Sequence, residues 1–464
     1  MFSQPFFVIL SVQFRKMQRT GVPTHLKGMI KRVSHTGILA AILLTAFSTV
    51  SLAESTWTLE DCLKQAKKAS LKLESAKLRE QAADISVKQA KSGNSPTVSA
   101  SIQNTLFDHP FIDNEDHYRL NLGISGSYTL WDGGATSLNV ESKTLTKEAT
   151  AFATQQTERS VQESVLNAYM SLLAASENLR TADASVELAQ AEFEHYSKLF
   201  EAGSITKKDL TQSQSNVLQK QTSQLSAQLS VSTAKTTLRQ LLELDDSAEF
   251  QVAAPETHIE NPDSLEPLPT YEQLKADAQK ANPGLKSDSI SVRAAQKNTQ
   301  VASKGSSITV TLGANSSTGL QAWESGDYKG QLKYGWQNSI SLGINIPIID
   351  GGATENKVLQ AQVNETESQV SLKENLKTLE NNIEKLYLNA VSADMQWKAA
   401  ILQVEAESEA LAVAEEQRGA GALTYTDFLT QKNNLEKARI TLTNAKYTSL
   451  LSRKLLELYQ GKLD

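Results

Sequence analysis

The five residues DGGAT stand at positions 132–136 and again, letter for letter, at positions 350–354. The two copies are separated by 218 positions. Upstream, the pattern LEDCLKQAKKASLKL that begins at Leu59 returns as YEQLKADAQKANPGL from Tyr271, 212 positions further on. Because the matches keep one order along the chain, they indicate two tandem copies of one unit.

The repeat sets the expected domain organisation. We expect a first structural repeat at residues 54–244 and a second at residues 270–460. The residues between them, 245–269, include four prolines and interrupt every apolar pattern, so we predict a linker there. A short polar tail at residues 461–464 follows the second repeat.

Residues 1–53 have the composition of a secretory signal peptide. Six basic residues and no acidic one precede or accompany an apolar run, GILAAILLTAFSTV, at residues 37–50. Small residues follow the run, which predicts cleavage after Ala53 and export from the cytoplasm. A membrane anchor is the alternative, but the run is shorter than the ~20 residues that a span requires. The basic segment is unusually long, so the start codon stays open among Met1, Met17 and Met29.

Charge and residue usage argue against an enzyme or a nucleic-acid-binding protein. The chain has 46 basic and 52 acidic residues, and loss of the six leader residues leaves 40 against 52, a net charge of −12. An acidic exported chain without a basic cluster is a poor partner for nucleic acid. The single cysteine, Cys62, excludes an intrachain disulfide and a thiolate metal site.

No catalytic motif or cofactor site is legible. The sequence lacks a phosphate-binding loop, a nucleophile elbow and a zinc-protease helix motif. His109 and His117 stand among acidic residues, but we favour a hydrated loop there over a cation site. We therefore predict no catalytic residue, no cofactor and no metal.

Two stretches carry apolar residues at alternating steps of four and three, at positions 161–200 and 372–404. This spacing averages about 3.5 residues per turn, which is typical of a coiled coil. A continuous helix over residues 353–418 would be about 100 Å long, at about 1.5 Å per residue. The pattern therefore predicts one very long helix in each copy.

Each long helix is expected to end at a glycine turn. Gly203 and Gly421 stand where a left-handed C-cap is needed. Thr-x-x-Asp sequences that end at Asp209 and Asp427 then open the next helix as capping boxes. Each copy should thus contain a long antiparallel helical hairpin.

Residues 118–130 and 340–348 alternate apolar and polar side chains, and shorter alternating stretches stand at 98–102 and 308–312. Alternation predicts strands with one apolar and one polar face. Such strands fit a soluble sandwich or an outer-membrane barrel whose apolar face meets lipid. Four strands are too few for a closed barrel, and a strand edge cannot stay open in lipid. We therefore expect other subunits to complete the sheet.

From Leu59 to about Tyr459 the sequence resembles the TolC family of outer-membrane factors. The resemblance rests on the duplication, on the two Gly-x5-Asp tips, and on two matching strand-to-helix turns. These turns consist of Asp132, Gly133 and Gly134 in the first copy and Asp350, Gly351 and Gly352 in the second. We interpret the glycines of the tips and of these turns as residues that the backbone conformation requires, and not as functional residues.

The resemblance implies an α+β membrane protein of the cell outer membrane. Tandem-duplicated helical hairpins would form a coiled-coil tunnel through the periplasm, and four strands per chain would enter a trimeric transmembrane β-barrel of twelve strands. The implied partners are two further copies of the chain, outer-membrane lipid, a periplasmic adaptor (membrane fusion) protein, and an inner-membrane ABC or proton-driven transporter. The implied function is an exit duct for efflux or type I secretion.

The resemblance also implies an acidic ring that narrows the periplasmic entrance. Asp427 falls on a ring position, and Thr430 stands where the family has a second acid. Arg418 occupies a place where the family can have a tyrosine link, and Asp209 matches the companion turn. Plain helix capping is the competing interpretation for both aspartates.

Two other kinds of protein compete with the duct. A periplasmic adaptor also uses a helical hairpin, but one hairpin flanked by compact β-domains. A secreted structural coiled coil would leave the strands unexplained. Within the duct interpretation, the substrate stays open between small molecules and secreted proteins, as do the adaptor, the transporter and the ion selectivity of the gate.

Overall fold

The computed structural model describes residues 56–106, 118–245, 251–253, 261–322 and 327–462. The predicted signal peptide and the loop that contains His109 and His117 lie outside these residues. From Thr56 onward the chain forms one structural unit.

The elements of the first copy are β1 (Thr56–Trp57), α2 (Leu59–Ala69), α3 (Leu71–Ser92), β2 (Thr97–Leu106), β3 (Tyr118–Trp131), α4 (Ala135–Glu201) and α5 (Lys207–Leu241). Those that follow are β4 (Gln251–Val252), η1 (Pro262–Ser264), α6 (Tyr271–Ala281), α7 (Pro283–Ser303), η2 (Lys304–Ser306), β5 (Thr309–Ala322), α8 (Tyr328–Tyr334), β6 (Gln337–Asn345), α9 (Ala353–Gly419) and α10 (Tyr425–Gln460). Helix, strand, strand, very long helix and long helix thus follow one another twice.

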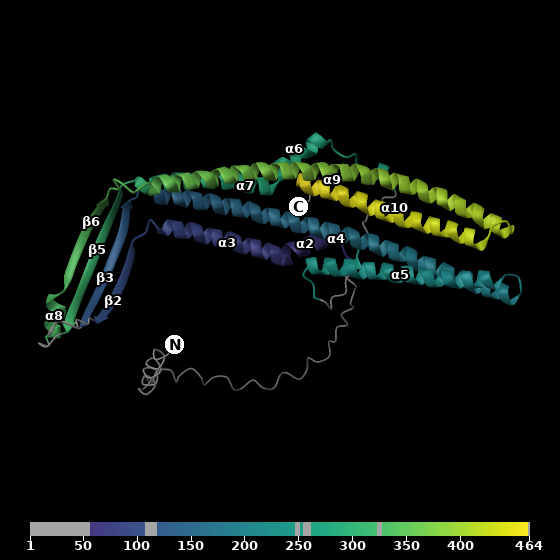
Figure 1. The fold of residues 1–464 in the computed structure, drawn as a ribbon, viewed down its shortest axis with the longest axis horizontal. Helices are drawn as coiled ribbons and strands as arrows, with labels where there is room; N and C mark the ends of the chain where they lie inside the picture. Colours follow the sequence, from purple (N-terminus) through teal and green to yellow (C-terminus); the bar gives the residue numbers. More distant parts are fainter. Residues whose placement is uncertain (1–55, 107–117, 246–250, 254–260, 323–326, 463–464) are drawn as a thin grey trace, which may run out of the picture. The chain divides into compact units, whose positions relative to one another are not determined.

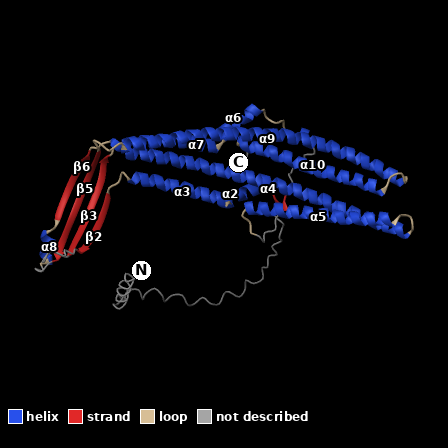
Figure 2. Cartoon of the chain, in the orientation of Figure 1, coloured by secondary structure: helices blue, strands red, loops and turns tan. Residues whose placement is uncertain are grey.

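The long helices form two antiparallel hairpins that lie side by side. Both α4 and α9 have 67 residues, and they are followed by α5 and α10, with 35 and 36 residues. Helix α10 also packs against α4, which joins the two hairpins. Figures 1 and 2 show the turns of both hairpins at the end of the helices away from the sheet. Among the described helices, none is both long enough and apolar enough to cross a membrane.

The core is a series of small clusters along the helices. One contains Cys62, Val165 and Leu238, which are fully buried between α2, α4 and α5. Another surrounds Trp397, which is fully buried between α9 and α10. Burial raises the pKa of the Cys62 thiol to about 12, with a smaller contribution from Asp61. This cysteine is therefore an inert packing residue.

The four main strands form one antiparallel sheet in the order β2-β3-β5-β6. The hairpins of the two copies have the same register, because Thr97 pairs with Ser127 and Thr309 pairs with Asn345. These pairs are related by the offsets of 212 and 218 positions that relate the two sequences. The pairing of β3 with β5 joins the two copies.

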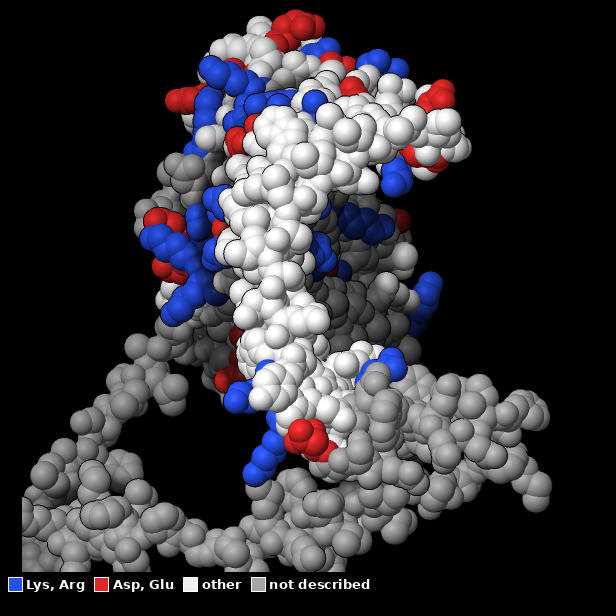
Figure 3. Space-filling model, turned by 90° about the vertical axis from the view of Figure 1, so that its left-hand side faces the viewer, with Lys and Arg blue, Asp and Glu red and all other residues white. Residues whose placement is uncertain are grey.

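The sheet has an apolar face and an uncharged polar face. One set of cross-strand rows is mostly aliphatic, such as Val98, Ala314 and Ile340, whereas the other consists mainly of Ser, Thr, Asn and Gly. On the polar face, the Ser99 and Ser125 hydroxyls are hydrogen-bonded at 3.0 Å. Figure 3, which views the sheet from the side of β6, shows a strip without charged side chains.

Three details of the structure differ from the expectations. The second-copy strand ends at Asn345, not at residue 348, because Pro347 cannot donate to a strand ladder and no described strand of this chain pairs there. The first helix of each copy is broken in two, at Ser70 and at Asn282. The segment between the copies contains β4, which pairs in parallel with β1 of the first copy.

Candidate functional site

The tips of the two hairpins share one backbone geometry. Gly203 and Gly421 have φ of 74° and 73°, a left-handed conformation that glycine adopts without a steric cost. The amide after each glycine reaches back to the helix, from Ser204 to Leu199 O and from Ala422 to Gln417 O, both at 2.8 Å. These bonds form Schellman caps and satisfy carbonyls that the helix end leaves open.

The two tip aspartates begin the following helices, with one difference. Asp209 forms a complete capping box with Thr206, in which its carboxylate also accepts the Thr206 backbone N–H at 3.4 Å. The Asp427 carboxylate accepts the Thr424 hydroxyl at 2.6 Å, and its amide donates to that hydroxyl at 3.2 Å. The expected second capping box is thus only half formed. This leaves the exposed Asp427 carboxylate less engaged than that of Asp209.

Arg418 lies in an aromatic cluster that joins the two hairpins. Its guanidinium donates to the Tyr196 hydroxyl of α4. Its central carbon lies 4.8 Å from the ring centroid of Tyr425 and 5.5 Å from that of Phe428, both of α10. The Tyr196 and Tyr425 rings are 4.5 Å apart. A cation on aromatic faces is worth about 0.5–2 kcal/mol per contact, so the cluster clamps α4, α9 and α10 together.

Burial controls the protonation of this cluster. Burial raises the pKa of Tyr196, and Arg418 only partly opposes the effect. The pKa of Tyr425 is raised further, first by burial and then by the neighbouring Glu192. Both phenols are therefore neutral at physiological pH. The clamp is a cation–π and hydrogen-bonding contact and not an ion pair with a phenolate.

Two half-buried ion pairs extend the clamp away from the tip. Lys432 of α10 lies 2.5 Å from the Glu192 carboxylate of α4. Lys220 of α5 pairs with Glu436 of α10 and donates to Asn433 at 2.7 Å. These residues line a cavity of about 200 Å³ among the four long helices. The second hairpin is thus bonded to both helices of the first.

The predicted gate residues do not all contact one another in the structure. Arg418 belongs to the clamp, whereas Asp427 and Thr430 are exposed beside it and form hydrogen bonds within α10 and its cap. Sequence reasoning missed Tyr425, Phe428 and the two lysine–carboxylate pairs. Their only signal was apolar and charged residues at coiled-coil spacing, which does not identify a partner in the other hairpin. The gate roles of Asp209, Arg418, Asp427 and Thr430 stay predictions.

The strand-to-helix turns are rigid caps at the other end of the long helices. Asp132 accepts the amides of Gly134 and Thr136 at 2.9 and 2.7 Å, and Asp350 repeats this pattern with Gly352 and Thr354. Burial opposes ionisation of Asp132, but these hydrogen bonds outweigh it and lower its pKa. The turns therefore cap the long helices where the strands end.

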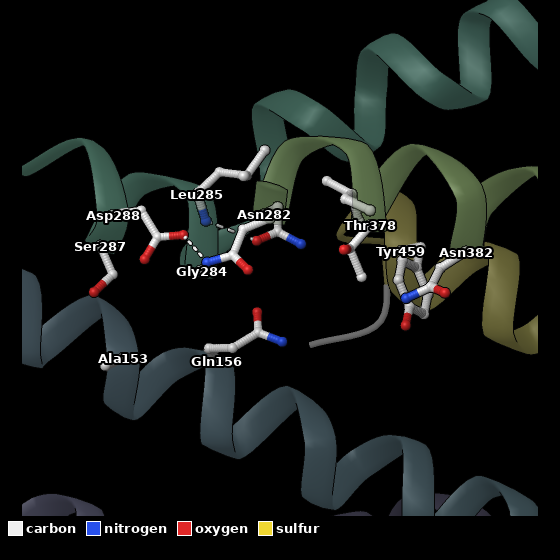
Figure 4. Close-up of a pocket in the computed structure, with 12 residues that line it drawn as sticks. Ala153, Gln156, Asn282, Gly284, Leu285, Ser287, Asp288, Thr378, Asn382 and Tyr459 are labelled. Carbon is white, nitrogen blue, oxygen red and sulfur yellow. Dashed lines mark hydrogen bonds between the residues drawn. The ribbon is translucent and has the colours of Figure 1, made fainter. Parts of the chain in front are cut away.

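A second cavity, of about 390 Å³, lies between α4, α7 and α9 (Figure 4). Its walls carry several carboxamides. That of Asn282 accepts the Leu285 amide at 3.0 Å, and that of Asn375 donates to Asp288 at 2.8 Å. These side chains serve helix capping and packing. Within the residues described, no group of three or more His, Cys, Asp and Glu could hold a metal ion.

Comparison with known proteins identifies the family. The sequence profile described as "Outer membrane efflux protein" matches residues 62–243 and again residues 274–462. No curated protein sequence matches the chain. The chain belongs to the outer membrane efflux protein family, whose members are transport ducts and not enzymes.

Solved structures share the fold at low sequence identity. The Campylobacter jejuni CmeC outer membrane channel is 18% identical, with a TM-score of 0.72 over 87% of this chain and 85% of that one. VceC of Vibrio cholerae is 18% identical, with a TM-score of 0.70 and coverage of 87% and 96%. The open state of Neisseria gonorrhoeae MtrE is 17% identical, with a TM-score of 0.71 and coverage of 87% and 88%. The predicted fold class, the TolC-type resemblance and the outer-membrane location are confirmed.

Proposed function

We propose that three copies of the chain form an exit duct across the outer membrane, with twelve strands in a shared barrel and the helical hairpins in a periplasmic tunnel. Residues 1–53 would direct export. Residues 54–244 and 270–460 would be the two repeats of each subunit, joined through 245–269 and followed by the tail 461–464. The observation that carries this proposal is the arrangement of the sheet edges.

The register between β3 and β5 predicts how the open edge strand β6 of one subunit would pair with the open edge strand β2 of the next. Within the described sheet, β2 and β6 each pair on one side only. The pairing of β3 with β5 shows how a second strand of one copy meets a first strand of the other, as in Ser127 with Gly313. Ser127 corresponds to Asn345 by the offset of 218, and Gly313 corresponds to Ser101 by the offset of 212. The same pairing between subunits therefore places Asn345 of one subunit opposite Ser101 of the next. Both belong to the polar face, so the match also preserves the lining of the lumen.

The same operation explains the short β6. It pairs residues 346, 347 and 349 with residues 100, 99 and 98 of the next subunit, and residue 348 corresponds to the residue of β3 at the register shift between Thr129 and Trp131. Ile348 and Ile349 are 89% and 91% exposed in the single chain. In the shared barrel, Ile346 and Ile349 would join the apolar rows of Ala100 and Val98 that face lipid, and the pairing would remove the exposed strand edge.

Unpartnered apolar ridges on the helices support the same assembly. Exposed side chains follow one another at steps of seven on α3 and on α9, and a similar row lies on α5. The α3 row is Leu71, Leu78 and Ile85; the α9 row is Leu388, Met395 and Leu402; the α5 row is Leu218, Leu225 and Leu229. A heptad ridge of this kind is typical of a coiled-coil contact with another helix.

The hairpin tips would form the entrance from the periplasm. The Arg418 clamp would hold the entrance narrow, and Asp427 would contribute one carboxylate per subunit to an acidic ring. Asp209 would cap the helix after the first tip turn. Because Thr430 stands in place of a second acid, the ring would contain fewer carboxylates. Opening would follow contact with a periplasmic adaptor and an inner-membrane ABC or proton-driven transporter, which would supply the energy. The family description favours efflux as the cargo route over type I secretion.

Cysteine cross-linking tests the strand register. We expect the double variant Ser101→Cys/Asn345→Cys to form disulfide-linked trimers on mild oxidation in outer membranes. Cys62 can stay, because it is buried and inert. The matched control Thr105→Cys/Asn345→Cys is four residues out of register, about 13 Å, and should stay unlinked. Equal linking of both pairs, or of neither, would contradict the shared barrel.

A further inference from the structure

The short helix α8 connects β5 and β6 at the end of the sheet away from the long helices (Figure 1). The Thr318 hydroxyl of β5 donates to the Leu332 carbonyl of α8 at 2.8 Å. Thr318 is paired with Leu122, so its side chain belongs to the apolar face. Helix α8 therefore lies on the apolar face of the sheet and not on the polar one.

Burial along the sheet confirms this side. Leu122, which pairs with Thr318, and Leu320 of β5 are half-buried on that face. Ile124, on the same central strand as Leu122 and the same face, is 55% exposed. Helix α8 thus covers part of the surface that would meet lipid. At this end of the sheet, it would lie at the outer leaflet.

The outer side of α8 is aromatic and basic. Tyr334 and Trp336 are 82% and 58% exposed. Large amphipathic rings of this kind concentrate at the boundary between hydrocarbon and headgroups. Lys329 and Lys333 are exposed one helical turn apart, and Lys333 extends over the Tyr334 ring at 5.5 Å.

Lys329 and Lys333 carry like charges on one face of α8. Like charges four residues apart on one helix face are unfavourable. Among the described residues, no carboxylate forms an ion pair with either lysine. The nearest acid in the chain's described part, Asp327, uses its carboxylate to cap α8 by accepting the Gly330 amide at 2.9 Å. An anion between the lysines would relieve this repulsion.

We propose that α8 is an interfacial anchor that binds phosphorylated lipid headgroups of the outer leaflet through Lys329 and Lys333. The flanking rings of Tyr334 and Trp336 would place the lysines at headgroup depth. This proposal rests on the membrane-spanning sheet of the proposed function, but not on the gate at the other end. It predicts a lipid preference that is local to one short helix.

Native mass spectrometry of the full-length trimer in detergent micelles tests the anchor, with phosphatidylglycerol, diphosphorylated lipid A and phosphatidylcholine as probes. We compare wild type with Lys329→Gln/Lys333→Gln. The matched control is Lys72→Gln/Lys77→Gln, which removes two exposed lysines of α3. Retention of the two anionic lipids should fall about fivefold for each α8 lysine removed. Phosphatidylcholine retention and the control should be unchanged.

Three outcomes would overturn the anchor. Unchanged anionic-lipid retention in the α8 variant would do so, as would an equal loss in the α3 control. Displacement of the lipids by millimolar inorganic phosphate would show a general anion site and not a lipid surface. In each case the variant should still conduct in planar bilayers. A chain that forms no trimer and never inserts into bilayers would instead contradict the proposed function itself.

Discussion

The two strand-to-helix turns are identical in sequence and nearly identical in backbone, yet their surroundings differ. Gly133 and Gly351 have φ of 70° and 62°. A Cβ on Gly133 would lie 2.4 Å from the Cβ of Ser307, whereas a Cβ on Gly351 would meet nothing within 4 Å. The residue that corresponds to Ser307 in the first copy is Ser95. The turn of the second copy therefore lacks the neighbour that Ser307 provides to the first, and in the proposed trimer Ser95 of the next subunit would take that place.

The largest effect is expected from alanine at these two glycines. Gly133→Ala combines left-handed strain with overpacking against Ser307 and should cost about 3 kcal/mol of folding free energy. Gly351→Ala should cost as much in the trimer, because Ser95 of the next subunit would take the place of Ser307. The measurement is the thermal midpoint of trimer dissociation. A much milder Gly351→Ala variant would contradict the equivalence of the two turns, and a partial rescue of Gly133→Ala by Ser307→Gly would support it.

The two hairpin tips also differ, although their backbones match. Positions equivalent to Arg418, Tyr425 and Phe428 hold Phe200, Lys207 and Leu210 in the first copy, so this copy cannot repeat the clamp. Arg418→Gln should weaken the packing of the two hairpins by about 2 kcal/mol. Because the clamp would keep the entrance narrow, the variant should also have a larger single-channel conductance. The matched change, Phe200→Gln, should leave conductance near wild type. Equal conductance in wild type and Arg418→Gln would exclude the clamp from gating.

The aspartates of the two strand-to-helix turns, Asp132 and Asp350, both have a lowered pKa, which predicts a pH effect on stability. The lowered pKa of Asp132 means that its stabilisation is complete above about pH 4, its ordinary range, and is lost as pH falls through the lower folded value. Asp132→Asn should therefore destabilise the trimer at pH 7 by about 1 kcal/mol and match wild type near pH 2. Melting curves across this range test the expectation. A difference that persists unchanged at low pH would mean that the carboxylate charge is irrelevant.

The smallest effect is expected at the entrance ring. Asp427→Asn should reduce the cation-over-anion permeability ratio about twofold, and Thr430→Asp should raise it by a similar factor. Asp209→Asn is the matched control, because its carboxylate is engaged in a complete capping box. Reversal potentials in a salt gradient provide the measurement. Equal shifts from Asp209→Asn and Asp427→Asn would reduce both residues to helix caps.

Local signals in the sequence were sufficient for the long elements. The 4-3 spacing and the glycine turn predicted a helix over 353–418, and α9 spans Ala353–Gly419. Glycines with positive φ stand where the caps required them, at Gly203 and Gly421. These features depend on residues close in the chain. The strand prediction was wrong for the single chain at residues 346–348, which would find a partner strand only in the proposed trimer.

The clamp and α8 were not predictable in the same way. Tyr196 and Arg418 are 222 positions apart and meet because α10 packs against α4 across the two hairpins. Their spacing in the sequence contains no trace of this contact. Helix α8 has seven residues, too few for a clear periodic pattern, and its position depends on the Thr318 bond.

The amino-acid sequence alone specifies the duplication, the alternating faces of the strands, the coiled-coil periodicity and the caps, because each follows from short-range backbone preferences repeated at fixed intervals. The packed fold establishes which side chains of the two copies meet, where Arg418 lies and which face of the sheet α8 covers. Those contacts depend on how two hairpins and four strands pack, and packing joins residues whose separation along the chain is arbitrary.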